Sequence, residues 1–288
     1  MAGREEWPGS VARRPAAWRS LIPVSRPPQL TVGIGRRFAA AAGLVYAAAH
    51  PCPASLRTSI RAMDLVIFDC DGVLVDSEVI AARIEAELIS RSGYEISAEE
   101  ISEGYAGLTF KDILLRIEEK ARIPFQASLI DQAEALTDKR LAAEVRAIDG
   151  AREAVLSVAG PRCVCSNSRT ERIELMLRKV GLLPLFEGKI FSSLSTPSGK
   201  PKPAPDVFLF AAGKMKADPA KTFVIEDSVH GVAGAKAAGM RVIGFTGAAH
   251  TYPGHADALT DAGAETVIRR WTELKPVLAA LAEWSENA

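Results

Sequence analysis

The amino-acid sequence predicts an α/β protein in which helices cover both faces of a parallel sheet and a separate helical domain is inserted. Two patterns indicate this class. Short apolar segments with β-branched centres alternate with helical patterns in residues 63–78 and 149–288, whereas residues 79–148 contain helical patterns alone. Continuous apolar strands joined by crossover helices are typical of a parallel sheet that is buried on both sides.

The strands of the sheet are predicted from short runs rich in Val, Ile, Phe or Cys: residues 64–69, 162–166, 222–226 and 241–245. Helical periodicity predicts the helices that cover them: residues 171–180, 205–212, 229–238 and 267–284. Gly181 and Gly239 occupy positions that are typical of helix C-terminal caps.

The inserted domain is predicted to be all-helical. Its helices are expected at residues 82–92, 110–120 and 128–145. Its joints to the core are expected near Glu78 and at residues 148–150. We interpret residues 79–148 as a cap over the active end of the sheet.

Residues 1–62 differ in composition from the rest of the chain. They contain nine arginines, no lysine and two glutamates, so the net charge of zero combines seven excess positive charges here with seven excess negative charges in residues 63–288. We interpret this extension as disordered, or as the result of a start assigned ahead of Met63. A targeting peptide is the alternative.

Charge and cysteine content exclude several classes of protein. The acidic balance of residues 63–288 argues against a nucleic-acid surface, which needs clustered Lys and Arg. The sequence has no run of about 18 uncharged apolar residues, which argues against a transmembrane helix. Four unevenly spaced cysteines favour reduced thiols over a disulfide framework or a zinc site. We therefore expect a cytoplasmic protein, monomeric or weakly dimeric, without a nucleic-acid or membrane partner.

Acidic residues lie at the ends of two predicted strands: Asp69 and Asp71 after the first, Glu226 and Asp227 after the third. Ligands bind at the carboxyl ends of parallel strands, so we expect these carboxylates to face one crevice. Two unit charges about 4 Å apart repel by about 4 kcal/mol at an effective dielectric constant of about 20, so the cluster needs a cation. Oxygen ligands without His or Cys favour Mg²⁺.

Groups suited to phosphate oxygens accompany the carboxylates. Ser166 ends the second strand, the turn after it offers N–H groups near a helix N-terminus, and Lys202 supplies a positive charge. Each segment alone also occurs in ordinary turns and helix caps. Their shared position at strand ends or helix starts indicates one phosphoryl-transfer site instead.

The same segments resemble the four signature motifs of the haloacid dehalogenase-like superfamily. The matching stretches are Asp69-Cys-Asp71-Gly-Val-Leu-Val-Asp76-Ser-Glu78, Ser166-Asn-Ser168, Lys202-Pro-Ala-Pro-Asp206 and Glu226-Asp-Ser-Val-His-Gly231. The resemblance covers about residues 63–250. It implies a Rossmann-like core with a helical cap inserted after the first strand.

The resemblance implies a role for each matching residue. Asp69 would be the nucleophile that forms an aspartyl phosphate, and Asp71 would protonate the leaving alcohol and then activate water. Residues two apart in an extended segment face the same side, which suits this pair. The implied Mg²⁺ ligands are the Asp69 carboxylate, the Asp71 carbonyl and Asp227, with Glu226 as a further or water-mediated ligand. The implied phosphate-binding groups are Ser166, the backbone of Asn167, and Lys202.

The resemblance further implies a phosphatase for a small phosphorylated sugar or sugar acid. Asp71 argues against dehalogenation, because dehalogenases of this superfamily lack the second aspartate. The cap segment at residues 107–111 lacks the arginine with which β-phosphoglucomutases hold a second phosphate. Lys111 could correspond to the imine-forming lysine of phosphonatases, although a surface position is favoured. Substrate specificity is assigned to Glu78, Gly107, Leu108, Thr109 and Lys111.

Two alternatives stay open. A hexose-phosphate mutase is the alternative enzyme, and a catalytically silent binding protein is the alternative of another class. The histidines His230, His250 and His255 are expected on the surface rather than as ligands.

Overall fold

The computed structural model describes residues 63–105 and 108–286. The interpretation of residues 1–62 therefore lies outside the described residues. The helices in the described part of the chain are too short or too polar to cross a membrane.

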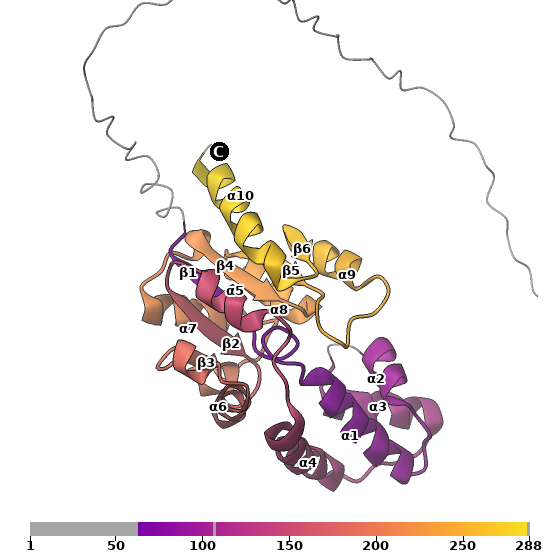
Figure 1. The fold of residues 1–288 in the computed structure, drawn as a ribbon. Helices are drawn as coiled ribbons and strands as arrows, with labels where there is room; N and C mark the ends of the chain where they lie inside the picture. The colour runs from indigo at the N-terminus through magenta and orange to yellow at the C-terminus, as the bar shows by residue number, and fades with distance from the viewer. Residues whose placement is uncertain (1–62, 106–107, 287–288) are drawn as a thin grey trace, which may run out of the picture. The chain divides into compact units, whose positions relative to one another are not determined.

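A six-stranded parallel sheet forms the core of this part of the chain, in the order β3-β2-β1-β4-β5-β6 (Figure 1). Its strands are β1 (Leu65–Phe68), β2 (Arg162–Ser166), β3 (Ile190–Ser192), β4 (Thr222–Glu226), β5 (Arg241–Phe245) and β6 (Thr266–Ile268). This is the order of a doubly wound, Rossmann-like sheet, and the direction of winding reverses between β1 and β4. The predicted fold class is confirmed.

Helices cover both faces of the sheet because alternate strand residues point to opposite sides. One face packs on α5 (Ala151–Ser157), α6 (Thr170–Lys179) and α10 (Leu274–Glu286). The other packs on α7 (Asp206–Met215), α8 (Val229–Ala237) and α9 (His255–Asp261). Short 3₁₀ turns lie at Leu183–Leu185, Ser193–Ser195, Pro219–Lys221 and Trp271–Glu273.

The inserted cap consists of α1 (Glu78–Arg91), α2 (Ala98–Gly104), α3 (Phe110–Ala121) and α4 (Ser128–Glu144) (Figure 1). The two connections to the core run side by side. The Asp76 N–H donates to the Arg146 carbonyl at 3.0 Å, and the Ile148 N–H donates to the Leu74 carbonyl at 3.1 Å. The cap therefore joins the core through one paired hinge.

Most predicted elements are present, with corrections. The strands at 162–166, 222–226 and 241–245 have the predicted bounds, and Gly181 and Gly239 follow α6 and α8 with positive φ, as expected of caps. Five elements were not predicted from the sequence: β3, β6, α2, α5 and α9. The predicted helix at 267–284 is wrong at its start, because residues 266–268 pair with β5 as an edge strand and the helix begins only at Leu274.

The buried centre of the sheet gives a test of the fold. Phe68 has no exposed surface, and its ring lies 6.1 Å from that of Phe186 and 5.9 Å from that of Trp271 between centroids. We expect Phe68→Ala to lower the free energy of unfolding by about 3–5 kcal/mol, because it removes apolar contacts and leaves a cavity. Urea denaturation measures this change. Leu156→Ala, at a position 53% exposed, is the control and should change it by less than about 0.5 kcal/mol.

Candidate active site

The candidate site lies where the strand order reverses, at the carboxyl ends of β1 and β4. β1 pairs with β2 on one side and with β4 on the other, so Asp69, directly after β1, lies between the ends of both. The Asp69 N–H donates to the Ile225 carbonyl of β4 at 3.0 Å. Glu226 ends β4, and Asp227 follows it. Reversal points of this kind are where open parallel sheets bind ligands.

Three carboxylates converge at this point. Asp69, Glu226 and Asp227 each place one oxygen within 4.8 Å of the others, and all three residues are buried. Burial raises the pKa of the Asp69 carboxyl, and repulsion from Glu226, Asp227 and Asp71 raises it further, against the opposing effect of Lys202. Burial likewise raises the pKa of Glu226. The cluster thus concentrates negative charge that favours a bound cation.

Lys202 reaches into this cluster. Its Nζ donates to Asp69 Oδ1 at 2.5 Å, to Glu226 Oε1 at 2.6 Å and to the Cys165 carbonyl at 2.8 Å, and its side chain is only 4% exposed. Burial alone would lower the pKa of Lys202, but the two carboxylates outweigh it and raise that pKa. The ammonium group therefore stays charged and offsets one of the buried negative charges.

The N-terminus of α8 holds Glu226 in place. The Ser228 N–H and Oγ donate to Glu226 Oε2 at 3.2 and 3.0 Å, and Ser228 Oγ accepts from the Gly231 N–H at 2.9 Å. A Cβ at Gly231 would lie 1.9 Å from the Glu226 carboxyl carbon. Gly231 is therefore required for the carboxylate to lie against the first turn of the helix.

Asp71 faces a ring of hydroxyl groups rather than the buried trio. Ser77 Oγ donates to its Oδ1 at 2.8 Å, and Ser166 Oγ and Ser168 Oγ donate to its Oδ2 at 3.0 and 2.9 Å. The backbone turns away at Gly72, where φ is +72°, and a Cβ there would lie 1.9 Å from Asp227 Oδ2. Ser77 and Ser168 are contacts that the sequence analysis did not assign.

The segment after β2 is tied to Lys202 through Asn167. Asn167 Oδ1 accepts from the Lys202 N–H at 2.8 Å. Ser166 Oγ accepts from the Ser168 N–H at 2.9 Å. The structure therefore brings together the three residues predicted to bind phosphate, beside Asp69 and Asp71.

The expectation that His250 and His255 lie on the surface is wrong. His250 Nε2 lies 3.0 Å from Asp227 Oδ2, with its side chain 14% exposed. His255 is buried, and its Nε2 lies 2.6 Å from the Asp227 carbonyl. Burial alone would lower the pKa of His250, but its hydrogen bond to Asp227 and the neighbouring carboxylates raise it. Applying the strand-end rule to the segment after β5 would have drawn attention to this loop. His230 is half-buried as well.

Glu78 begins the cap at the edge of the site. Desolvation by the surrounding protein raises the pKa of the Glu78 carboxyl to about 8, and repulsion from Asp71 and Asp227 raises it further. The residue nevertheless keeps an exposed surface. It is therefore a solvent-accessible acid placed beside the cluster.

The other predicted specificity residues lie at the start of α3. Thr109 Oγ1 caps this helix by accepting from the Asp112 N–H at 3.2 Å, Lys111 is exposed and Leu108 is half-buried. Gly107 lies outside the described residues. No hydrogen bond or ion pair of the described residues joins this segment to the carboxylates.

A different part of the cap contacts the core. On α4, Asp138 Oδ2 pairs with Arg169 Nη2 at 2.5 Å, and its Oδ1 pairs with Arg172 Nε at 2.6 Å. Away from the hinge, these are the ion pairs that join cap and core within residues 63–105 and 108–286. Arg169 directly follows Ser168, whose hydroxyl holds Asp71.

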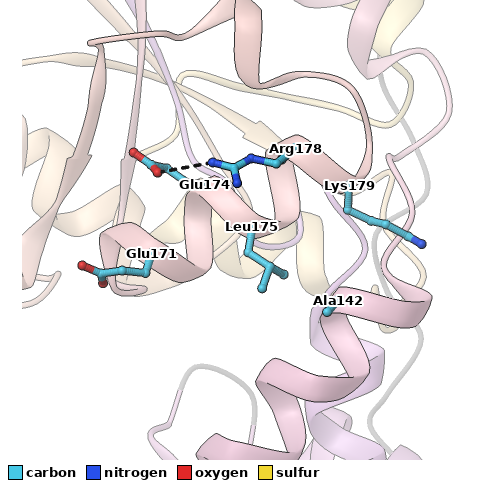
Figure 2. Close-up of a pocket in the computed structure, with 6 residues that line it drawn as sticks. All are labelled: Ala142, Glu171, Glu174, Leu175, Arg178 and Lys179. Carbon is cyan, nitrogen blue, oxygen red and sulfur yellow. Dashed lines mark ion pairs between the residues drawn. The ribbon is translucent and has the colours of Figure 1, made fainter.

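A cavity of about 480 Å³ is lined by residues of α4 and α6 and by none of the carboxylates (Figure 2). Glu171, Glu174, Leu175, Arg178 and Lys179 of α6 line it together with Ala142 of α4. It contains none of the groups at the strand ends. The candidate site is therefore assigned to the ends of β1, β2 and β4 because of the functional groups there, and not because of the volume of a cavity.

Sequence and structure comparisons identify relatives of this chain. A model of the haloacid dehalogenase-like hydrolases matches residues 63–239. The 6-phosphogluconate phosphatase of Escherichia coli (strain K12) is 29% identical over 192 residues, which are 66% of this chain and 86% of that protein. A haloacid dehalogenase-like protein of unknown function from Agrobacterium tumefaciens is 55% identical, with a TM-score of 0.74 over 76% of this chain and 99% of that one. A family hydrolase from Deinococcus radiodurans with bound phosphate and sodium is 33% identical, with a TM-score of 0.65 over 77% and 96% of the two chains.

The buried ion pairs of Lys202 give a test of the electrostatics. We expect Lys202→Met to cost about 3–5 kcal/mol of stability at pH 8 in EDTA, because it leaves Asp69 and Glu226 buried without a cation. Their folded-state pKa values are raised, so this loss should shrink as the pH falls and the carboxyls become protonated. Urea denaturation at pH 8 and pH 5 measures it, with the exposed Lys189→Met as the control. A cost that is equal at both pH values would contradict this account.

Proposed function

The chain belongs to the haloacid dehalogenase-like hydrolases, and from this premise we propose that it is a Mg²⁺-dependent phosphatase that hydrolyses a small phosphorylated sugar or sugar acid through an aspartyl phosphate. It is a phosphoric monoester hydrolase, since its relatives in the family are named as phosphatases. The observation that supports the aspartyl-phosphate mechanism is the position of Asp69. Lys202 holds this residue beside Asp71, whose carboxylate is oriented by other groups.

In the first step, an Asp69 carboxylate oxygen attacks phosphorus while the bond from phosphorus to the leaving alcohol breaks. Asp71 donates a proton to the departing oxygen. In the second step, Asp71 takes a proton from water, whose oxygen attacks the phosphorus and releases Asp69 and inorganic phosphate. The hydroxyl groups of Ser77, Ser166 and Ser168 support this role because they fix the orientation of the Asp71 carboxylate.

Binding of the phosphoryl group is assigned to Ser166, the backbone of Asn167 and Lys202. Lys202 and Asn167 are hydrogen-bonded to each other, so their positions are set together. The related hydrolase from Deinococcus radiodurans was crystallised with phosphate, which supports an anion site in this family. Since the transition state spreads negative charge over the phosphoryl oxygens, these donors would stabilise it without making covalent bonds.

The residues present fit a divalent cation. Asp69, Glu226 and Asp227 converge within 4.8 Å, and Lys202 offsets only part of their charge. These three carboxylates and the Asp71 carbonyl would hold Mg²⁺, in keeping with its preference for oxygen ligands. When bound, Mg²⁺ would offset negative charge on the transferred phosphoryl group.

The leaving group would lie between the strand ends and the cap. Glu78, Gly107, Leu108, Thr109 and Lys111 remain the proposed specificity residues. The similarity to a 6-phosphogluconate phosphatase supports a sugar or sugar acid. A cytoplasmic location and a monomer or weak dimer complete the proposal.

A panel of sugar phosphates tests the proposed function. We expect release of inorganic phosphate that requires Mg²⁺ and is lost in EDTA, with 6-phosphogluconate among the first substrates to measure. Conversion of β-glucose 1-phosphate to glucose 6-phosphate without phosphate release would establish the mutase instead. Binding of sugar phosphates without turnover would favour the silent binding protein.

The two aspartates should differ in their effect on turnover. We expect Asp69→Asn to abolish phosphate release, because the amide cannot form the covalent intermediate. Asp71→Asn should lower kcat by about 10²–10⁴-fold, because it removes general acid–base catalysis. Steady-state phosphate release measures both, with circular dichroism as the control for folding. An active Asp69→Asn variant would rule out the proposed nucleophile.

A further inference from the structure

The loop between β5 and α9 brings a histidine to the acid cluster. His250 Nε2 lies 3.0 Å from Asp227 Oδ2, and its Nδ1 is buried without a hydrogen-bond partner. We propose that His250 is a positioning residue for Asp227: its Nε2–H fixes the carboxylate in the orientation that holds the metal ion. This inference rests on the proposed Mg²⁺ site.

Each of the other acidic side chains at the strand ends has hydrogen-bond partners elsewhere. Lys202 holds Asp69 and Glu226, and serine hydroxyls hold Asp71. Among the described residues, the side-chain partner of the Asp227 carboxylate is His250. Without this contact, rotation about the side-chain bonds of Asp227 would be opposed only by packing.

Gly72 leaves the space in which this contact forms. A Cβ at this position would lie 1.9 Å from Asp227 Oδ2 and 2.7 Å from His250 Cε1. The backbone after Asp71 therefore lies directly against both members of the pair. A carboxylate confined between a histidine donor and the adjacent backbone is restricted to few orientations.

The loop itself is anchored on both sides of His250. The Ala249 N–H donates to Asp76 Oδ1 at 3.3 Å, which ties the loop to the hinge of the cap. His255 Nε2 lies 2.6 Å from the Asp227 carbonyl, and the His255 ring stacks on Tyr252 with centroids 4.5 Å apart. The loop and the first residue of α9 thus contact both the side chain and the backbone of Asp227, and these contacts restrict the position of His250.

Metal affinity tests the inference without relying on activity. We expect His250→Phe, which keeps a ring but loses the donor, to weaken Mg²⁺ binding by about 10–100-fold, the usual effect of removing a group that orients a metal ligand. His250→Gln, whose amide can replace the Nε2 donor, should restore most of the affinity. Isothermal titration calorimetry with Mg²⁺ alone on the full chain measures all three proteins. His230→Phe, the same change at a half-buried histidine on α8, is the matched control.

The outcomes separate this inference from the proposed function. Absence of Mg²⁺ binding in the wild-type protein would overturn both. Wild-type binding with unchanged affinity in His250→Phe would overturn the role of His250 alone. In kinetics, we expect the Mg²⁺ concentration for half-maximal rate to rise while kcat at saturating Mg²⁺ recovers; a fall in kcat alone would instead place His250 on the substrate and overturn the positioning role.

A measurement on the wild-type protein covers the case in which His250→Phe does not fold. Nitrogen-15 NMR of the histidine rings reports which ring nitrogens carry protons. We expect a proton on Nε2 of His250 and a change in its signal in Asp227→Asn. An Nε2 without a proton cannot donate to the carboxylate and would overturn the proposal.

Discussion

The structure of the site depends on the contact of one buried lysine with two buried carboxylates. Lys202 Nζ lies between Asp69 and Glu226, and the three side chains have almost no exposed surface. Burying an ionised carboxylate without a partner is costly, so this cation stabilises both acids at the ends of the central strands. Lys202 also donates to the Cys165 carbonyl, so one side chain ties together the ends of β1, β2 and β4.

The central strands could be predicted because both of their faces are buried. The segments of β2, β4 and β5 are nearly continuous apolar runs, and short runs of this kind are typical of strands that are buried on both faces. The edge strands β3 and β6 have only three residues each and are partly exposed, so they carry no comparable pattern. Val267 and Ile268 consequently extended the apolar periodicity of the C-terminal helix in the sequence, although they pair with β5.

The acidic residues of the site could be predicted for the same reason, since each lies directly after a recognisable strand. His250 and His255 could not, because their positions depend on how a loop folds back over Asp227. The end of β5 draws attention to this loop, but nothing in the local pattern distinguishes a histidine that returns to the site from one that faces water. Long-range contacts such as the hydrogen bond between the Ala249 N–H and Asp76 fix that path.

One contact between the cap and the core involves the segment that helps to orient Asp71, the proposed acid–base residue. Asp138 of α4 pairs with Arg169 and Arg172 at the start of α6, and Arg169 is adjacent to Ser168, which donates to Asp71. Arginines at a helix N-terminus oppose the helix dipole, so the Asp138 carboxylate offsets an unfavourable charge there. Motion of α4 relative to α6 would therefore strain these ion pairs or shift the segment that, with Ser77 and Ser166, orients Asp71. In the proposed mechanism, these contacts therefore link the position of the cap to the alignment of the acid–base residue.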